Sequence, residues 1–323
     1  MTRKERPKVT LLAGGVGAAR LLRGLVSLVD PDSLTVVVNT GDDEDFYGLH
    51  VSPDLDTIVY TLAGLSPRDR GWGIRGDTHR VLGALERFYG PGWFALGDRD
   101  IATHVFRTDR LRAGATLSEC TQEICAALGV RVHVVPATDD RLRTLIETDE
   151  GTLAFQNYLV KRRGRPTVRA VRYDGHETAR PAPGVLEAIA GADVVVIAPS
   201  NPFVSVGPIL AVPGVRAALA HAAAKTVAIS PLIRGSAVKG PLAAMLGSME
   251  HGADAAAIAR IYRGLASVLV VAPGDAPGAA APDGPRLVEH DILLDSVTAA
   301  RRLSRFVLAL AAARAEGQAR RLS

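Results

Sequence analysis

The feature that most constrains this chain is the regular alternation of short apolar runs, rich in β-branched residues, with stretches of helical pattern. The apolar runs are expected to be strands buried on both faces, and they are 9–13, 34–39, 132–135, 193–198, 226–230 and 268–272. The helical stretches between them are 18–29, 78–89, 117–128, 215–224 and 296–313. This alternation predicts an α/β fold that is Rossmann-like and doubly wound, with a mainly parallel sheet.

Local signals refine this outline. Thr116-Leu-Ser-Glu119 is a capping box that marks a helix start, and Pro213-Gly214 marks another helix entry. Residues 141–174 alternate as exposed antiparallel strands do, so we expect a smaller α+β insertion over 131–184. The Rossmann-like core then comprises 1–130 and 185–323. An Ala-, Gly- and Pro-rich stretch predicts a surface loop at 274–285.

Charge and aromatic content argue against a nucleic-acid binder. The chain has 323 residues with 38 Lys plus Arg and 34 Asp plus Glu, so the net charge is only +4. Basic clusters occur at 161–165 and in the last predicted helix, yet aromatic residues make up only 5% of the chain and do not interleave with them. We interpret both clusters as solvated faces.

The cysteines and the hydropathy pattern predict a cytoplasmic protein. Cys120 and Cys125 are too few for a disulfide framework or a zinc site, and we interpret both as small core or semi-exposed residues in a reducing compartment. The basic start at 1–8 followed by apolar residues imitates a signal peptide, but glycines and an arginine interrupt the apolar part. No apolar run reaches the roughly 20 residues that a membrane helix needs.

A glycine-rich turn follows the first predicted strand. Gly14, Gly15 and Gly17 allow close backbone approach to a phosphate, and a helix N-terminus with free N–H groups follows. A nicotinamide-binding turn is disfavoured, since Arg20 replaces its third glycine and Asn39 stands where an acidic residue would hold the ribose. No Gly-Lys-Ser/Thr of a P-loop follows. A purely structural turn remains the alternative for this motif.

Four aspartates follow the second predicted strand, at the edge where open α/β sheets bind ligands: Asp42, Asp43, Asp54 and Asp56. One or two of them are expected to cap the helix that runs to Leu62. Four carboxylates beside a phosphate-binding turn would repel a polyanion unless a cation lies between them. We therefore expect a Mg²⁺ site here, because Mg²⁺ is held by carboxylates together with substrate oxygens.

Both tryptophans occur in the segments 71–78 and 93–100. These segments predict either one wall of an aromatic ligand pocket, with Arg99 facing an anion, or a hydrophobic staple with Asp98 or Asp100 at a helix cap. The spacing slightly favours the staple and cap. His104 is expected by default to be a packing histidine.

The fourth predicted strand opens into Ser200-Asn201-Pro202, with Ser205 shortly after, and the next strand ends similarly in Ser230-Pro231. Such groups suit hydrogen bonds to a phosphate or a base edge, and an Asx or Ser turn is the structural alternative. Small polar turns at several strand ends are unlikely to be coincidental.

Taken together, these motifs resemble those of the 2-phospho-L-lactate transferase family of coenzyme F420 biosynthesis. The segments that carry the resemblance are Gly14-Gly-Val-Gly-Ala-Ala-Arg20, Asn39-Thr-Gly-Asp-Asp43, His50-Val-Ser-Pro-Asp-Leu-Asp-Thr57, Gly71-Trp-Gly73, Leu96-Gly-Asp-Arg-Asp100, Ala102-Thr-His104, Pro136-Ala-Thr-Asp-Asp140, Phe155-Gln156 and Ala198-Pro-Ser-Asn-Pro202. The form of 136–140 and of 209–219 is similar to the bacterial phosphoenolpyruvate transferase branch.

The resemblance implies a Mg²⁺-dependent transferase. A phosphoenolpyruvyl or 2-phospholactyl group would move from its guanosine diphosphate ester to the ribityl hydroxyl of the deazaflavin FO, releasing GMP. The core would then bind nucleotide and deazaflavin, the partners would be these small molecules, with no nucleic acid and no membrane, and the chain would form a homodimer. The identity of the three-carbon acid, whether enolpyruvate, lactate or glycerate, is left open.

The resemblance also implies roles for single residues. Catalysis would involve Asp56 and Asp42, and Mg²⁺ would be held by Asp42 and Asp54. Substrate binding would fall to a larger set: Gly14, Gly15, Gly17, Arg20, Asn39, Asp43, Asp56, Asp98, Arg99, His104, Ser200, Asn201 and Ser205. Archaeal relatives carry a basic residue where this chain has Ala95, so that side chain's contacts are absent here.

Two other functions compete with this interpretation. A UDP-sugar-binding regulator of the same fold superfamily would carry an Asp-Asp-Gly-Gly-Ser-Ser type loop, whereas here Asp42-Asp43 continues as Glu44-Asp45-Phe46. A nicotinamide-dependent oxidoreductase is disfavoured by Arg20 and Asn39, as above.

Overall fold

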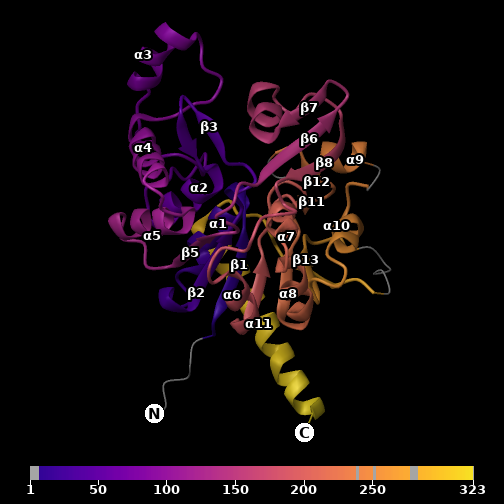
Figure 1. Cartoon of the computed structure of the whole chain (residues 1–323). Coiled ribbons are helices and arrows are strands. Elements are labelled where there is room, and N and C mark those ends of the chain that lie inside the picture. The colour runs from indigo at the N-terminus through magenta and orange to yellow at the C-terminus, as the bar shows by residue number, and fades with distance from the viewer. Residues whose placement is uncertain (1–6, 238–239, 250–251, 277–282, 323) are drawn as a thin grey trace.

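A seven-stranded sheet forms the centre of the computed structural model, which describes residues 7–237, 240–249, 252–276 and 283–322 (Figure 1). All its neighbouring strands pair in parallel. The strand order across the sheet is β14 (Arg286–Glu289), β13 (Val268–Val271), β10 (Thr226–Ile229), β9 (Val194–Ile197), β1 (Val9–Ala13), β2 (Leu34–Val38) and β5 (His133–Pro136). The prediction of an α/β fold with a parallel sheet is confirmed.

The sheet reverses its strand order beside β1. The chain runs from β1 outward through β2 to β5, then returns through β9 on the other side of β1. Connections therefore leave β1 and β9 in opposite directions, which opens a crevice at the carboxyl ends of these two strands. The glycine-rich turn after β1 and the polar turn after β9 both lie at this position.

Helices cover both faces of the sheet, and each face has its own apolar core. One core joins α1 (Gly15–Leu25), α2 (Pro53–Leu62), α5 (Leu117–Ala127) and α11 (Val297–Leu322), and the other joins α6 (Val185–Gly191), α7 (Val206–Ala211), α8 (Val215–His221), α9 (Leu242–Ser248) and α10 (Ala255–Ile261). Successive residues of β1 face opposite sides of the sheet: Leu11 packs in the core with α1, and Leu12 packs in the core with α7. Burial on both faces explains why these strands read as continuous apolar runs.

The predicted helix starts are largely confirmed. Thr116 accepts a hydrogen bond from the backbone N–H of Glu119 and forms the full capping box of α5. α8 begins directly after Gly214. α1 starts earlier and α11 ends later than the apolar pattern indicates, at Gly15 and Leu322.

A separate antiparallel sheet has the strand order β7 (Gly151–Ala154), β6 (Arg143–Thr148) and β8 (Val168–Asp174). Its strands are those expected of the α+β insertion. The predicted boundary at residue 131 includes β5, which instead pairs with β2 in the main sheet. The antiparallel part thus begins after β5, and the division into two domains stays a prediction.

Of the remaining elements, the short turns at 31–33 and 223–225 directly precede β2 and β10 at the amino edge of the main sheet, and the hairpin and helices that follow β2 lie toward its carboxyl edge. A hairpin follows β2, and α3 stands away from the sheet in Figure 1, connected to α4. These elements and the short ones are β3 (Glu44–Phe46), β4 (Leu49–Val51), α3 (Arg80–Tyr89), α4 (Asp98–Arg112), η1 (Pro31–Ser33), η2 (Asn157–Lys161), η3 (Ala223–Lys225), β11 (Leu232–Ile233) and β12 (Ser236–Ala237).

Several smaller expectations can be compared with the structure. Both cysteines are free and buried. Every helix among the described residues is too short or too polar to span a bilayer. Of the predicted loop 274–285, residues 277–282 lie outside the described residues, as do residues 1–6 of the basic start.

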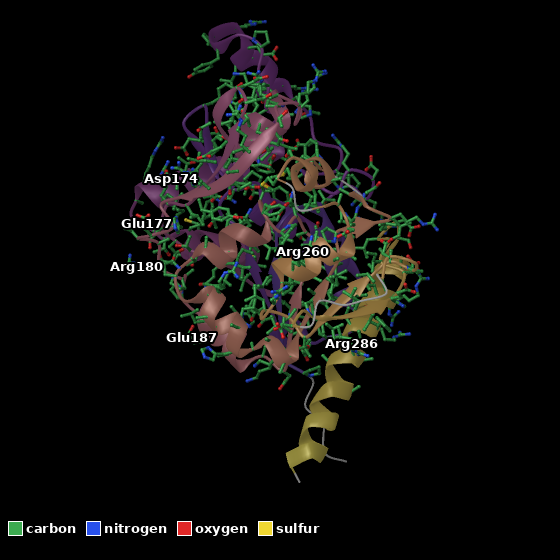
Figure 2. The ribbon with its side chains drawn as sticks, turned by 90° about the vertical axis from the view of Figure 1, so that its right-hand side faces the viewer. Asp174, Glu177, Arg180, Glu187, Arg260 and Arg286 are labelled. Atoms are coloured by element: carbon green, nitrogen blue, oxygen red, sulfur yellow. The ribbon has the colours of Figure 1, made fainter. Side chains whose placement is uncertain are left out.

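Charges of both signs are interspersed on the face that Figure 2 turns to the viewer. The residues labelled there come from β8, α6, α10, β14 and the loop before α6: Asp174, Glu177, Arg180, Glu187, Arg260 and Arg286. This face is therefore not a uniformly basic surface of the kind that holds a nucleic-acid backbone.

Candidate active site

A cavity of about 540 Å³ opens at the carboxyl edge of the main sheet. Turns that follow β1, β2, β9 and β10 contribute to its lining, as does the start of α2. Of the residues predicted to form the site, those that line the cavity are Gly14, Gly15, Gly17, Arg20, Asp42, Asp54, Asp56, His104, Ser200, Asn201 and Ser205. Most of the predicted site residues are thus brought together.

The glycine-rich turn packs directly against the turn after β9. Ser200 Oγ donates a hydrogen bond of 2.7 Å to the carbonyl oxygen of Gly14. A Cβ on Gly14 would lie 2.6 Å from Cβ of Ser205, and one on Gly17 would lie 2.2 Å from the carbonyl oxygen of Pro199. These glycines therefore have a packing role, and the same turn presents the N-terminus of α1 to the cavity.

Asp54 links α2 to the N-terminus of α1. Its Oδ1 accepts a hydrogen bond of 2.8 Å from the Gly15 N–H, and its Oδ2 accepts one of 2.9 Å from Asn39 Nδ2. Asn39 is buried and lies behind the cavity wall, where its Oδ1 accepts from the Gly41 N–H. Burial nevertheless raises the pKa of Asp54 to about 6.

Asp42 is the least satisfied carboxylate at the cavity. It is buried, and its Oδ1 has no hydrogen-bond partner among the described residues. Burial, and then the charge of Asp54, raise the pKa of Asp42 well above its usual range. Two buried carboxylates that repel each other, one with an orphaned oxygen, are a donor set that a hard divalent cation fits.

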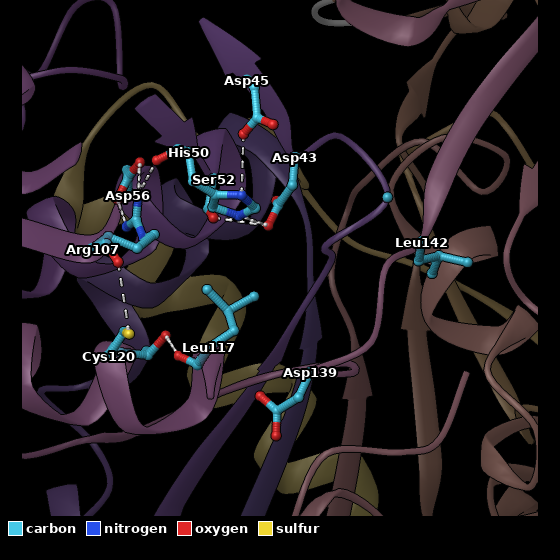
Figure 3. Close-up of polar contacts among 12 residues, drawn as sticks. Asp43, Asp45, His50, Ser52, Asp56, Arg107, Leu117, Cys120, Asp139 and Leu142 are labelled. Carbon is cyan, nitrogen blue, oxygen red and sulfur yellow. Dashed lines mark hydrogen bonds and ion pairs between the residues drawn. The ribbon is translucent and has the colours of Figure 1, made fainter. Parts of the chain in front are cut away.

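Asp43 supports the β3–β4 hairpin and does not line the cavity. Ser52 Oγ donates to Asp43 Oδ2 at 2.8 Å, and His50 Nε2 lies 3.1 Å from the same oxygen (Figure 3). The expected capping of α2 by one or two of the aspartates is not seen. The N-cap residue is Ser52, whose hydroxyl is turned to Asp43 and makes no hydrogen bond to the helix backbone. Asp43 and Asn39 are thus placed one layer behind the lining.

Asp56 forms a buried ion pair that the sequence did not reveal. Arg107 Nη1 donates to Asp56 Oδ2 at 3.2 Å, and Nη2 donates to Oδ1 (Figure 3). Arg107 is only 2% exposed. A buried guanidinium of this kind balances the charge of a buried carboxylate. One sequence signal could have pointed to this cluster: the spacing of Asp100, His104 and Arg107 places the three side chains on one face of a helix.

The aromatic side chains form a wall of the cavity, as one of the two sequence interpretations expected. Trp72, Trp93 and Phe94 line it, and Phe94 stacks on Phe46 with ring centroids 4.1 Å apart. Tyr60 of α2 also lines the cavity. Such a wall suits a planar aromatic ligand.

The expectation that Asp98 and Arg99 line the pocket is not met, because neither belongs to the cavity lining. Asp98 accepts hydrogen bonds from the N–H groups of Arg80 and Val81 at the start of α3. In return, Asp77 accepts from the Arg99 N–H at the start of α4. Asp98, in the first turn of α4, thus caps α3, and Asp77, just before α3, caps α4. The helix-cap interpretation is therefore the one that holds for Asp98.

Known proteins resemble this chain along most of its length. A family model described as 2-phospho-L-lactate transferase CofD matches residues 9–302. A phosphoenolpyruvate transferase of Streptomyces griseus is 46% identical over 260 residues, which are 79% of this chain and 82% of that protein. A 2-phospho-L-lactate transferase of Methanospirillum hungatei is 37% identical over 300 residues, 93% of this chain and 99% of that protein.

Among solved structures, a UPF0052 family protein from Bacillus halodurans superposes with a TM-score of 0.56 at 19% identity, covering 94% of this chain and 99% of that one. That likeness concerns the fold alone. The family match and the relatives do not favour a UDP-sugar-binding regulator. With a family match across most of its length and relatives well above 30% identity, this chain belongs to the 2-phospho-L-lactate transferase family.

Proposed function

We propose that this transferase moves a phosphoenolpyruvyl group from its guanosine diphosphate ester to the ribityl hydroxyl of FO, releasing GMP, in coenzyme F420 biosynthesis. A 2-phospholactyl group is the second candidate. We place the phosphoenolpyruvyl group first because of the relatives: the protein named phosphoenolpyruvate transferase is 46% identical to this chain, and the one named 2-phospho-L-lactate transferase is 37% identical. We further propose that the enzyme is a cytoplasmic homodimer.

The observation that carries the proposal is the carboxylate pair Asp42 and Asp54 beside the turn at Gly15. The described cavity lining contains one guanidinium, Arg20, against four aspartates. A diphosphate ester would meet net repulsion there without an added cation. The orphaned Oδ1 of Asp42 and the raised pKa of Asp54 fit Mg²⁺, which Asp42 and Asp54 would hold. When bound, Mg²⁺ would neutralise the charge on the diphosphate and on the departing phosphate.

The protein's own groups would do the positioning. The N-terminal amides of α1 near Gly17 and the guanidinium of Arg20 would bind phosphate oxygens. Ser200, Asn201 and Ser205 would supply hydrogen bonds on the opposite side of the crevice.

The aromatic wall formed by Trp93 and Phe94 would flank the deazaflavin ring. Asp56, held by Arg107, would lie on this deazaflavin side and help to order the hydroxyl end.

The proposed reaction requires little covalent help. The ribityl oxygen forms a bond to the phosphorus that carries the three-carbon acid, and the bond from that phosphorus to the bridging oxygen of GMP breaks. The electron pair of the broken bond leaves with GMP, which is a stable anion and needs no strong general acid. Positioning and charge neutralisation therefore account for most of the expected acceleration.

The test uses the purified chain with FO, Mg²⁺ and the guanosine diphosphate esters of enolpyruvate, lactate and glycerate in turn. We expect GMP release together with a more anionic deazaflavin product, fastest with the enolpyruvyl ester and abolished by EDTA. Asp42→Asn is expected to lower turnover by roughly 10²-fold or more. Asp109→Asn, on the exposed side of α4, is the matched control.

Two results would contradict the proposal. One is the absence of GMP release with every ester in the presence of Mg²⁺. The other is tight binding of a UDP-sugar with no affinity for guanosine nucleotides.

A further inference from the structure

We propose that Asp100 is the group that orients the attacking hydroxyl and accepts its proton, and that Tyr60 and His104 hold Asp100 in place for this task. This inference rests on the proposed function and adds a residue to it. Asp100 lies on α4 and lines the same cavity as Asp42 and Asp54.

The two oxygens of Asp100 have different surroundings. Tyr60 donates its hydroxyl to Oδ1 at 2.8 Å, and His104 Nε2 lies 3.3 Å from the same oxygen. Oδ2 has no side-chain or backbone donor among the residues that the structure describes. The Asp100 side chain keeps 15% of its surface exposed although it lies beside the fully enclosed His104. One oxygen is therefore anchored and the other is available to a ligand.

The tautomer of His104 follows from its neighbours. Arg107 Nη1 lies 3.4 Å from His104 Nδ1, and a guanidinium can only donate. Nδ1 therefore accepts, which leaves the hydrogen on Nε2. That nitrogen lies 3.3 Å from Asp100 Oδ1 as an ion-pair contact and makes no hydrogen bond among the described residues. Arg107 is itself fixed by both oxygens of Asp56. Contacts therefore run from Asp56 on α2 through Arg107 and His104 on α4 to Asp100, and Asp100 in turn contacts Tyr60 on α2. Together these contacts fix the orientation of the Asp100 carboxylate.

The other carboxylates at the cavity are less suited to receive a proton from the hydroxyl. Both oxygens of Asp56 accept from Arg107, and Asp42 and Asp54 are the proposed cation ligands. Asp56, Asp100 and His104 lie close enough to form a metal-binding group. Arg107 already supplies a positive charge at that point, so the group is better described as an ordered hydrogen-bond network.

The charge state of Asp100 agrees with this role. Burial alone would raise its pKa, but the contacts with His104, Tyr60 and Arg107 outweigh burial and lower the pKa of Asp100. The carboxylate is thus ionised throughout the neutral range. The charged and titratable groups facing it are Tyr60, His104, Arg107, the Asp56 carboxylate and Asp77, whose Oδ2 accepts from the Asp100 N–H at 3.1 Å.

In the proposed step, one proton moves to Asp100 and a new P–O bond replaces the bond to GMP. The ribityl O–H bond breaks, its proton passes to Asp100 Oδ2, and its electron pair forms the new O–P bond. The P–O bond to GMP breaks, and GMP keeps that electron pair. The Asp100 carboxylic acid then returns its proton to water after the product leaves, which restores the carboxylate.

The experiment compares wild type, Asp100→Asn, Asp100→Glu and the control Asp109→Asn with FO, Mg²⁺ and the guanosine diphosphate ester that wild type uses. We expect Asp100→Asn to lower kcat by roughly 10²–10⁴-fold, with both KM values and FO binding by fluorescence titration changed less than about threefold. Asp100→Glu keeps a carboxylate and is expected to recover part of that loss.

The pH profile supplies a readout that a merely structural role would not move. Wild type should show a kcat independent of pH above about pH 7, where the Asp100 carboxylate is ionised and Asp54, whose pKa is about 6, is ionised as well. In Asp100→Asn the residual kcat should instead rise up to about tenfold per pH unit, because hydroxide must take the proton.

Each outcome decides between distinct conclusions. If the kcat of Asp100→Asn lies within threefold of wild type, or if its kcat does not change with pH, the role of Asp100 is overturned and the proposed function is not affected. If Asp100→Asn fails to fold or to bind FO, the Asp100→Glu variant decides. The role is overturned if that variant binds FO but turns over at less than about a thousandth of the wild-type rate. Wild type that releases no GMP overturns the proposed function, and this role with it.

Discussion

At the scale of single residues, the cavity concentrates negative charge that the protein only partly balances. Asp56 has Arg107 as its counter-ion, whereas Asp54 has two neutral donors, Gly15 N–H and Asn39 Nδ2, and Asp42 keeps an orphaned oxygen. The unbalanced pair is the one next to the glycine-rich turn. The site without its ligands is therefore a source of instability, which the proposed cation would relieve.

This imbalance makes the stability of the metal-free protein depend on pH. The pKa of Asp54 is about 6 when folded against an ordinary 3.8, so the folded state holds its proton more tightly than the unfolded state. Stability from this group is complete below about pH 4 and is lost as the pH rises to about 6, by roughly 3 kcal/mol.

Urea unfolding in EDTA between pH 4 and pH 8 measures this loss. Asp54→Asn should flatten the decline, Asp109→Asn should keep it, and Mg²⁺ should restore stability mainly above pH 6. An unchanged slope in Asp54→Asn would show that Asp54 is not the titrating group.

At the scale of elements, the site depends on how closely two turns approach. The β1–α1 turn passes the β9 turn so tightly that only hydrogen fits at Gly17, opposite the Pro199 carbonyl. Ser200 fastens the two turns together through the carbonyl oxygen of Gly14. The direction of the α1 N-terminus, and so of its free N–H groups, follows from this contact.

A pair of glycine substitutions separates packing from backbone entropy. Gly17→Ala would force Cβ to 2.2 Å from the Pro199 oxygen, so we expect it to lower the free energy of unfolding by about 1–3 kcal/mol and to weaken binding of the guanosine ester. Gly83→Ala, in α3 with nothing within 4 Å of its Cβ, should instead stabilise by about 0.5–1 kcal/mol. Calorimetric melting and nucleotide titration measure both, and a Gly17→Ala variant as stable as wild type would refute the packing argument.

Much of this element-level picture could be predicted from the sequence. Strands such as β1 and β9 are buried on both faces, so hydrophobicity alone marks them, and the acidic and glycine-rich turns then fall at one sheet edge. β14 escaped prediction because it is an edge strand with exposed and half-exposed residues.

The sequence predicts a capping role for Asp98 but does not show which helix it caps, and it does not predict the role of Arg107. The partners of Asp98 are backbone N–H groups about 17 residues away, and an arginine is ordinarily expected at the surface. For Asp100 the sequence pattern indicates only a helix cap, because its contact with Tyr60 spans 40 residues.

At the scale of the whole molecule, α3 differs from the other α-helices, each of which has buried residues among those described. No described residue of α3 is buried, and Phe88 is 82% exposed. The helix projects from the body in Figure 1; the reciprocal contacts of Asp77 and Asp98 and the ring contact between Tyr47 and Tyr89 connect it to the rest. By contrast, α1 packs on α11 and buries six of its residues.

We therefore expect strongly unequal backbone protection. Amides of α3 should exchange with deuterium roughly 10²-fold or more faster than those of α1, because opening α3 exposes little apolar surface. Hydrogen-exchange mass spectrometry with peptides covering 78–92 and 15–27 provides the comparison. Equal protection of the two helices would mean that a partner surface covers α3.

The hydrogen bond between Ser200 and Gly14 joins positions 186 residues apart, and the cavity also takes Ile292 and Leu294 from near the other end of the chain. During synthesis the acidic loops leave the ribosome long before either of those closing segments exists. A chain that ends before residue 292 therefore carries the repelling carboxylates in a cavity whose wall is incomplete. The C-terminal quarter, which carries none of the recognised motifs, thus completes the wall of the cavity that those motifs line.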